Sequence, residues 1–221
     1  MRARKGPSRT RLARLALLVP LAFPALAGPP TLWIDDFEGG LRPGWKERSF
    51  QGRTRYEVVA DDGNRILRAE SEGAASGLVY EVDFDPREYP VLAWRWKVEG
   101  LAAASDPTRR GGDDYPARVY VVFPHWFFPR TRSLVYIWAT DFPPGKPVPN
   151  PFTGNAVMIA VRSGPQHVGR WVEERRNLVE DFRAAFGEDP PRAGAVALMT
   201  DTDQTGERAV AFYDDLRLLG R

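Results

Sequence analysis

The stretch GGDDYPARVYVVF (111–123) contains the residues with the clearest capacity for chemistry. Asp113 and Asp114 lie in a glycine-rich turn, and Arg118 opens a run that otherwise reads as a buried strand. A guanidinium beside carboxylates can help to bind an anionic or hydroxyl-rich ligand. The alternative is structural: Asp114 pairs with Arg118 and fixes the turn.

Strand alternation predicts what surrounds Arg118. In the strand 117–123 the apolar side chains would face the core, which places Arg118 on the opposite face. The preceding strand, 91–98, has Arg95 and Lys97 opposite a face of leucine and tryptophan. If these strands are neighbours, the three cations form one basic surface with acids at its rim, suited to a carboxylate, a phosphate or a glycan. The predicted ligand-binding residues are Arg95, Lys97, Asp113, Asp114, Arg118, Tyr120, Asp201 and Asp203.

The loop DTDQTGE (201–207) is the most distinct motif of oxygen-bearing side chains in the sequence. Asp201, Asp203 and Gly206 match the start of a calcium-binding EF-hand loop. The match ends at the twelfth position, where Phe212 stands in place of a bidentate glutamate. The motif is therefore either a turn capped by its own side chains or a cation site of another kind.

Familiar catalytic signatures are missing from the sequence. It has no nucleophile elbow, P-loop, dinucleotide-binding glycine motif or zinc-protease motif, no cysteine and two histidines. The enzymatic hypothesis that remains is a carboxylate pair, Asp113 or Asp114 with Asp201 or Asp203, acting on cell-envelope polysaccharide. Two carboxylates roughly 5–10 Å apart across one cleft would support it.

The N-terminus has the parts of a secretory signal peptide. Residues 1–27 combine six basic residues, a thirteen-residue apolar run and an Ala-Leu-Ala exit. The apolar run is broken by Pro20 and Pro24 and is too short to span a bilayer. We therefore expect cleavage after Ala27, a periplasmic or secreted product, and one domain over 28–221.

Cleavage would reverse the sign of the net charge. Removing six basic residues from the 31 of the whole chain leaves 25 against 29 acidic ones, a formal charge of −4. The basic character of the whole chain thus belongs to the leader and does not indicate a nucleic-acid partner.

The chain is rich in short runs of alternating polarity separated by turn residues. Such runs predict an all-β fold, a jelly-roll-like antiparallel β-sandwich. The predicted strands are 31–37, 55–60, 65–70, 77–84, 91–98, 117–123, 133–139, 156–162, 194–200 and 209–219. Helical spacing over 172–186, followed by Gly187, predicts one amphipathic helix packed against the sandwich.

Seven tryptophans raise the question of sugar binding, because flat aromatic faces can pack on sugar rings. Most of them fall in strand patterns, which favours the core. The exception is PHWFFPR (124–130), where Trp126, Phe127 and Phe128 lie between prolines. They form either an exposed platform or a small core under the loop.

Several motifs together are similar to a known family. WRWKV, GDDYPARVYVVF, YIWA, RNLVEDFRAAFGEDPP and MTDTDQTG, in this order, resemble exported bacterial proteins classed as domain-of-unknown-function family 3047. The resemblance covers nearly all of 32–219. It implies a single secreted domain and assigns no activity.

The two ends carry a weaker resemblance. WIDDFEGG near the start and FYDDLRLL near the finish are similar to the first and last strands of jelly-roll carbohydrate-binding modules. In those modules, acids near the paired termini often hold a structural calcium. Apart from such a calcium, the sequence indicates no cofactor. The candidate metal ligands are Asp35, Asp36, Glu38, Asp201, Asp203, Asp214 and Asp215.

Three functions follow from these observations. The first is a non-catalytic binding module for a glycan or another polar or anionic ligand, and the second is the carboxylate-dependent enzyme. The third is a structural or partner-binding protein of the cell envelope.

Overall fold

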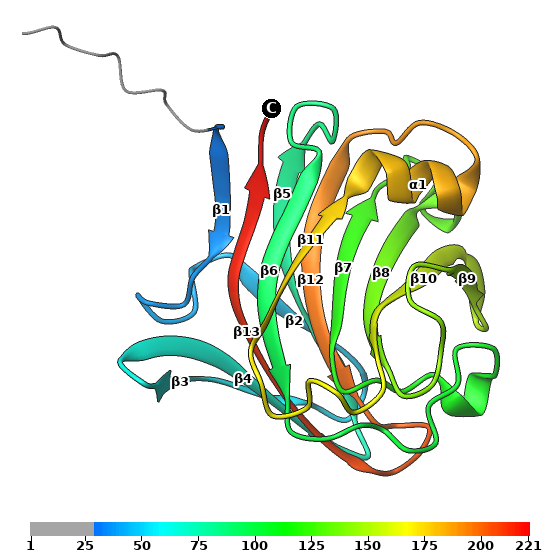
Figure 1. The fold of residues 1–221 in the computed structure, drawn as a ribbon. Helices are drawn as coiled ribbons and strands as arrows, with labels where there is room; N and C mark the ends of the chain where they lie inside the picture. Colours follow the sequence, from blue (N-terminus) through cyan, green and yellow to red (C-terminus); the bar gives the residue numbers. More distant parts are fainter. Residues whose placement is uncertain (1–28) are drawn as a thin grey trace, which may run out of the picture.

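The computed structural model describes residues 29–221 as a sandwich of two β-sheets with one helix at its edge (Figure 1). The predicted signal peptide, 1–27, lies outside the described residues. Sheet A has the order β11-β6-β13-β4-β3, with β1 also paired to β13, and sheet B has the order β2-β5-β12-β7-β8-β10-β9. The pairs with given register are antiparallel except β8 with β10, which is parallel. The predicted β-sandwich is confirmed.

The strands of sheet A are β1 (Thr31–Asp35), β3 (Arg55–Asp61), β4 (Asn64–Glu72), β6 (Val91–Val98), β11 (Val172–Asn177) and β13 (Arg208–Leu219). Those of sheet B are β2 (Trp45–Gln51), β5 (Ala75–Phe84), β7 (Arg118–Phe123), β8 (Arg132–Ala139), β9 (Pro147–Asn150), β10 (Thr153–Ser163) and β12 (Ala193–Asp201). All ten predicted strands are present within a few residues of their expected ends. Strands β2, β9 and β11 were not predicted.

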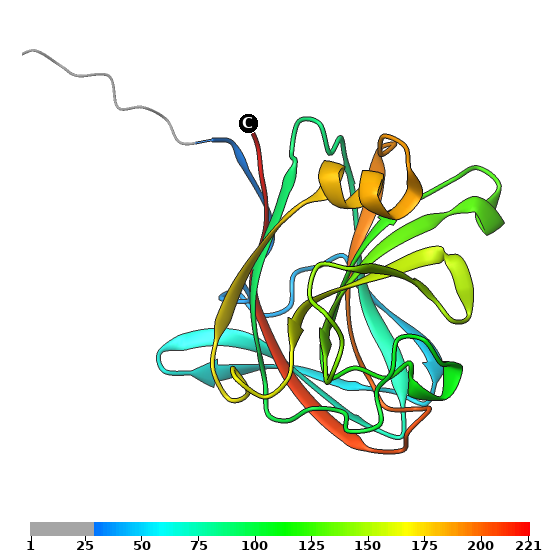
Figure 2. The ribbon, with the colours of Figure 1, turned by 45° about the vertical axis from the view of Figure 1, so that its right-hand side comes forward.

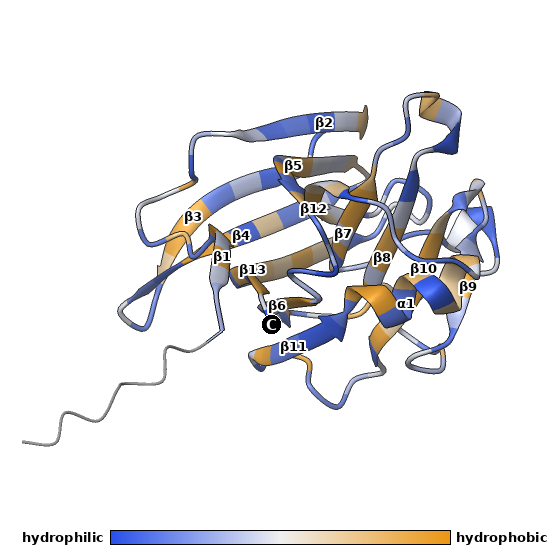
Figure 3. Cartoon of the chain, turned by 90° about the horizontal axis from the view of Figure 1, so that it is seen from above, coloured by the Kyte–Doolittle hydropathy of each residue, from blue (hydrophilic) through white to orange (hydrophobic). Residues whose placement is uncertain are grey.

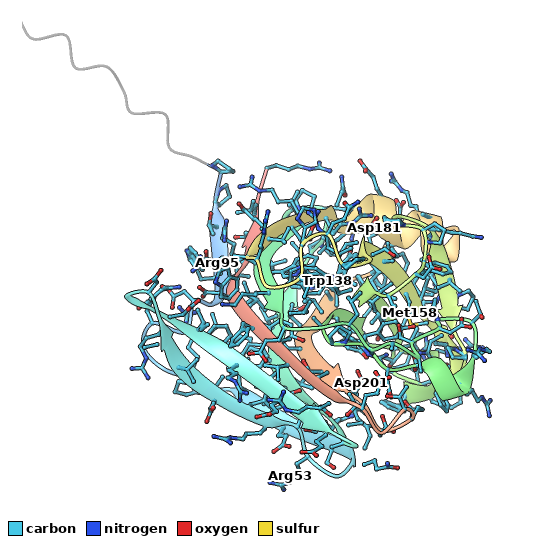
Figure 4. The ribbon with its side chains drawn as sticks, turned by 60° about the horizontal axis from the view of Figure 1, so that its bottom comes forward. Arg53, Arg95, Trp138, Met158, Asp181 and Asp201 are labelled. Carbon is cyan, nitrogen blue, oxygen red and sulfur yellow. The ribbon has the colours of Figure 1, made fainter. Side chains whose placement is uncertain are left out.

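The main core lies between the sheets and is held by aromatic pairs. Trp94 on β6 stacks on Tyr136 of β8 with ring centroids 5.3 Å apart, and Trp96 meets Trp138 at 5.7 Å. All four side chains are fully buried, and Figure 4 places Trp138 inside the sandwich. Strand alternation explains the arrangement, because the side chains that face inward from both sheets are apolar.

The helix is shorter than predicted. Helix α1 spans Leu178–Phe186, and the first part of the predicted helix, 172–177, is the strand β11, paired with β6. Asn177 accounts for the boundary, because its side chain accepts hydrogen bonds from the backbone N–H groups of the first helical turn. The predicted end is confirmed: Gly187 has a left-handed φ of 75°. Figure 3 shows the apolar and polar faces of α1.

A second, smaller core covers part of the outer face of sheet B. Side chains of β8 and β10 pack there against Tyr115, Phe142 and Val148, which come from the connections before β7 and after β8 and from β9. Because these segments cover β8 and β10, the outward residues of β2, β5 and β12 are left as the open part of the sheet.

Residues 29–221 contain all the strands of both sheets and the two buried clusters. The one α-helix among these residues is far too short to cross a bilayer, and no candidate span is found there.

Candidate functional site

Arg118 lies at the centre of a buried ion-pair cluster, with its side chain 3% exposed. Its Nε donates to Asp201 Oδ1 at 2.7 Å, and its Nη2 donates to the other Asp201 oxygen. Its Nη1 donates to Asp113 Oδ1 at 3.2 Å, and its guanidinium lies over the ring of Tyr115 at 4.5 Å. The arginine is therefore satisfied by protein groups on all sides, as a buried charge must be.

Asp114 has a different role from the expected one. Its carboxylate accepts hydrogen bonds from the backbone N–H groups of Gln204 and Thr205, the latter at 2.6 Å, so it fastens the turn after β12. The carboxylate that pairs with Arg118 in the turn is Asp113, so the predicted structural pairing of Asp114 with Arg118 is wrong. Asn150 on β9 donates to the second oxygen of Asp113 at 2.7 Å.

Acidic residues outnumber basic ones around Arg118, since Asp113, Asp114, Asp201 and Asp203 all lie in this cluster. Burial raises the pKa of Asp201 to about 7, although the Arg118 guanidinium acts to lower it. Burial and the nearby Asp114 carboxylate raise the pKa of Asp203 as well. Burial alone would lower the pKa of Arg118, but the Asp201 and Asp113 carboxylates outweigh it and hold this pKa well above its usual value.

The predicted single basic surface is wrong. Arg118 faces away from the inter-sheet core, as predicted, but Arg95 and Lys97 lie on β6 in the other sheet. Figure 4 shows Arg95 and Asp201 on separate strands of the sandwich. The strands β6 and β7 follow each other in sequence, but the connection between them crosses from sheet A to sheet B. A sequence pattern predicts on which face of a strand a side chain lies, but not which of the two sheets the strand joins.

Arg95 and Lys97 already have partners on the outer face of sheet A. Arg95 Nε donates to Asp214 Oδ2 at 3.0 Å, and Lys97 Nζ lies 3.3 Å from Asp61 Oδ2. Both cations pack on the ring of Trp171, at 4.9 and 5.0 Å from its centroid. They form a surface network of paired charges rather than a vacant anion site.

The candidate metal ligands are only partly brought together. Among residues 29–221, one group of three acids has carboxylate oxygens within 4.8 Å of one another, and it consists of Asp114, Asp201 and Asp203. The end-strand acids do not join such a group. Asp35, for example, accepts from Trp45 Nε1 at 2.8 Å and from the backbone N–H of Phe37 at 2.9 Å, and so it orders the turn after β1.

A groove on the outer face of sheet B is the feature that the sequence did not indicate. It has a volume of about 490 Å³ and crosses β2, β5, β12 and β7. The central strand β12 contributes Ala195, Ala197 and Met199 to its floor, beside Gly194 and Leu198, and β5 contributes Gly77 and Val79. Small side chains at the centre of the sheet thus create the hollow.

Larger side chains border this groove. Phe50 on β2 stands on one side, 69% exposed, and Phe128 stands on the other, 74% exposed. Tyr120, one of the predicted ligand residues, lies on the floor. Arg118 shares its face of β7, but is not among the lining residues. The lining side chains that carry polar groups are Arg48, Glu81, Tyr120, His125, Thr131 and Ser133.

A second hollow, about 790 Å³, adjoins the groove at Pro124 and His125. Its lining is charged, but Glu188 pairs with Arg132 and Asp189 pairs with Arg183. Arg130, which also lines it, has no ion pair among residues 29–221, but the hollow lacks the continuous apolar floor of the groove, and so the groove is the better candidate for a glycan site.

The sequence matches the family described as "Protein of unknown function (DUF3047)" over residues 43–217. The chain belongs to this family. The predicted family is therefore confirmed for this member of DUF3047, and no curated protein matches it at a significant level.

Several solved structures are similar to this DUF3047 domain over most of its length. The family 11 carbohydrate-binding module of the cellulosomal cellulase Lic26A-Cel5E of Clostridium thermocellum is 13% identical, with 88% of this chain and 97% of that chain covered and a TM-score of 0.49. The family 30 module of the cellulase Cel9D-Cel44B of the same organism is 10% identical, with 80% and 92% covered and a TM-score of 0.44. Because the sequence identities and TM-scores are this low, we do not assign the role of any residue in those modules to a residue of this chain.

Proposed function

We propose that the protein is an exported, non-catalytic binding module that holds a glycan in the groove of sheet B. The observation that carries this proposal is the groove itself, an apolar floor between the exposed rings of Phe50 and Phe128. The C–H faces of sugar rings pack on such apolar and aromatic surfaces, and the few polar side chains at the rim would hydrogen-bond the hydroxyls.

A carboxylate-dependent hydrolase fits this geometry less well. Among the described residues that line the groove, Glu81 is the one carboxylate, and it pairs with Lys46 at 3.0 Å. A glycosidase mechanism of the usual type needs two carboxylates facing one substrate. The acids of the Arg118 cluster do not supply the second, because they do not line the groove and they accept hydrogen bonds from the protein.

The decisive variant is Ala197→Trp. Ala197 lies at the centre of the groove floor and points away from the inter-sheet core, so an indole there would fill the groove without disturbing the core. On a glycan array, the protein beginning at Gly28 should bind at least one glycan class, and Ala197→Trp should lose that binding with an unchanged melting temperature. Phe50→Ala should weaken it.

The matched control is Trp33→Ala, which removes an exposed aromatic ring from β1, outside the groove. This variant should bind as the unmodified protein does. If Ala197→Trp retained full binding, the groove would not be the site. If the protein released reducing ends from a bound polysaccharide over time, the enzymatic function would replace the proposal.

A further inference from the structure

The turn between β7 and β8 exposes three aromatic side chains in succession. Trp126 is 91% exposed, Phe127 48% and Phe128 74%. The predicted alternative of a small core under this loop is therefore wrong. Phe128 borders the groove, whereas Trp126 and Phe127 do not line it. Contiguous exposed apolar surface of this kind marks an interaction site.

The turn holds these rings in a defined arrangement. The Arg130 N–H donates to the Phe127 carbonyl at 2.8 Å, and the Phe127 N–H donates to Nδ1 of His125 at 3.0 Å. Asn155 on β10 donates its Nδ2 hydrogen to the Pro129 carbonyl at 2.6 Å, which ties the turn to the sandwich. In Figure 2 the turn extends beyond α1 at the right of the molecule. The aromatic rings are thus presented on a projecting, internally bonded tip.

Basic residues follow the aromatic ones. The segment 124–132 contains Arg130 and Arg132 and no acid. Arg132 pairs with Glu188, whereas no ion pair of Arg130 occurs among residues 29–221. A tryptophan and phenylalanines beside an uncompensated arginine combine apolar surface for a membrane interface with charge for anionic headgroups.

We propose that this tip docks onto the surface of an anionic lipid bilayer. Trp126 and Phe127 enter the interfacial layer, and Arg130 contacts the headgroups. A sugar platform explains these two rings less well, because the Trp126 ring lies beside the rings of His125 and Phe127, at 5.6 and 5.9 Å, and neither Trp126 nor Phe127 lines a groove that could enclose a sugar. The inference is independent of the groove and adds a second binding surface to the molecule.

The test is co-sedimentation with lipid vesicles. The protein beginning at Gly28 is used, because the leader's apolar run would itself bind lipid, and residues 29–221 contain both complete sheets. It should bind vesicles of phosphatidylethanolamine and phosphatidylglycerol. Trp126→Ala combined with Phe127→Ala should weaken binding at least about tenfold, the equivalent of about 1.4 kcal/mol. Arg130→Gln should weaken it about fivefold, as expected for about 1 kcal/mol per basic residue, and only on anionic vesicles.

Two controls separate this proposal from that of the groove. Trp33→Ala, an exposed tryptophan on β1, should leave vesicle binding unchanged, and so should Ala197→Trp. The proposal is overturned if the unmodified protein does not sediment with anionic vesicles or if the double variant sediments equally well. It is also overturned if the double variant loses only glycan binding, or if it converts a dimer into a monomer, since the tip would then bind a sugar or a second copy.

Discussion

Arg118 and Asp201 are 83 residues apart in the sequence and form a bidentate ion pair beneath the connections that cover sheet B. The pair joins the start of β7 to the end of β12, and Asp113 ties the preceding loop to the same guanidinium. Protein groups satisfy both partners, and so we expect the cluster to stabilise the fold.

Arg118→Ala should therefore destabilise the domain strongly. Removal of one partner leaves the Asp201 and Asp113 carboxylates buried without their counter-charge, which in comparable cases costs about 3–5 kcal/mol of unfolding free energy. Urea denaturation monitored by tryptophan fluorescence would measure the change. Arg183→Ala is the matched control: its guanidinium and its partner Asp189 are both exposed, so the loss of this pair should cost much less. Equal losses for the two variants would contradict the structural role.

The pH dependence of stability should reveal Asp201. Because burial raises its pKa from 3.8 to about 7, the folded state holds a proton that the unfolded state releases. The contribution of Asp201 is thus full below pH 3.8 and is lost as the pH rises towards 7. Asp201→Asn should remove this decline, so that its unfolding free energy falls less between these pH values. Parallel curves for the two proteins would show that Asp201 does not titrate in this range.

Chelator should leave the melting temperature unchanged. The Asp114 carboxylate already accepts two backbone hydrogen bonds and Asp201 is paired with Arg118, so both have protein partners in place of a cation. The measurement is a thermal melt of dialysed protein with and without EDTA. A lower melting temperature with EDTA would instead indicate a bound cation, because a ligand held only by the folded state stabilises it.

The mature protein should begin near Gly28. Expression with the native leader in a bacterium, followed by mass spectrometry of the N-terminal peptide, checks this cleavage. A membrane-bound product that retains Met1 would show that residues 1–27 are an anchor.

The strands could be predicted well because their signals are local. Period-two alternation marks strands with an apolar inner face and a polar outer face, such as β6, whose observed bounds of 91–98 equal the predicted ones. Strand β2 was not predicted because its sequence, WKERSFQ, is mostly polar, as suits a strand at the exposed edge of a sheet. Strand β11 was read as helix because its polar residues continue into the helical spacing after Asn177.

The candidate site was harder to predict because it depends on which strands become neighbours. The faces of Arg118 and Arg95 followed from alternation, but the assignment of β6 and β7 to opposite sheets depends on tertiary packing. The groove could not be predicted for another reason. Its signal is the small size of Ala195 and Ala197 beside Gly77, and small residues carry no chemical signature in a sequence.

The alternation along β12 separates two properties of the protein. Val196 and Leu198 face the inter-sheet core, whereas Ala195 and Ala197 face the groove. Substitutions at the first pair change how the sheets pack, and substitutions at the second pair change the shape of the hollow. The shape of the groove can therefore diverge between related chains through the outward positions of one strand, while the inward positions keep the fold unchanged.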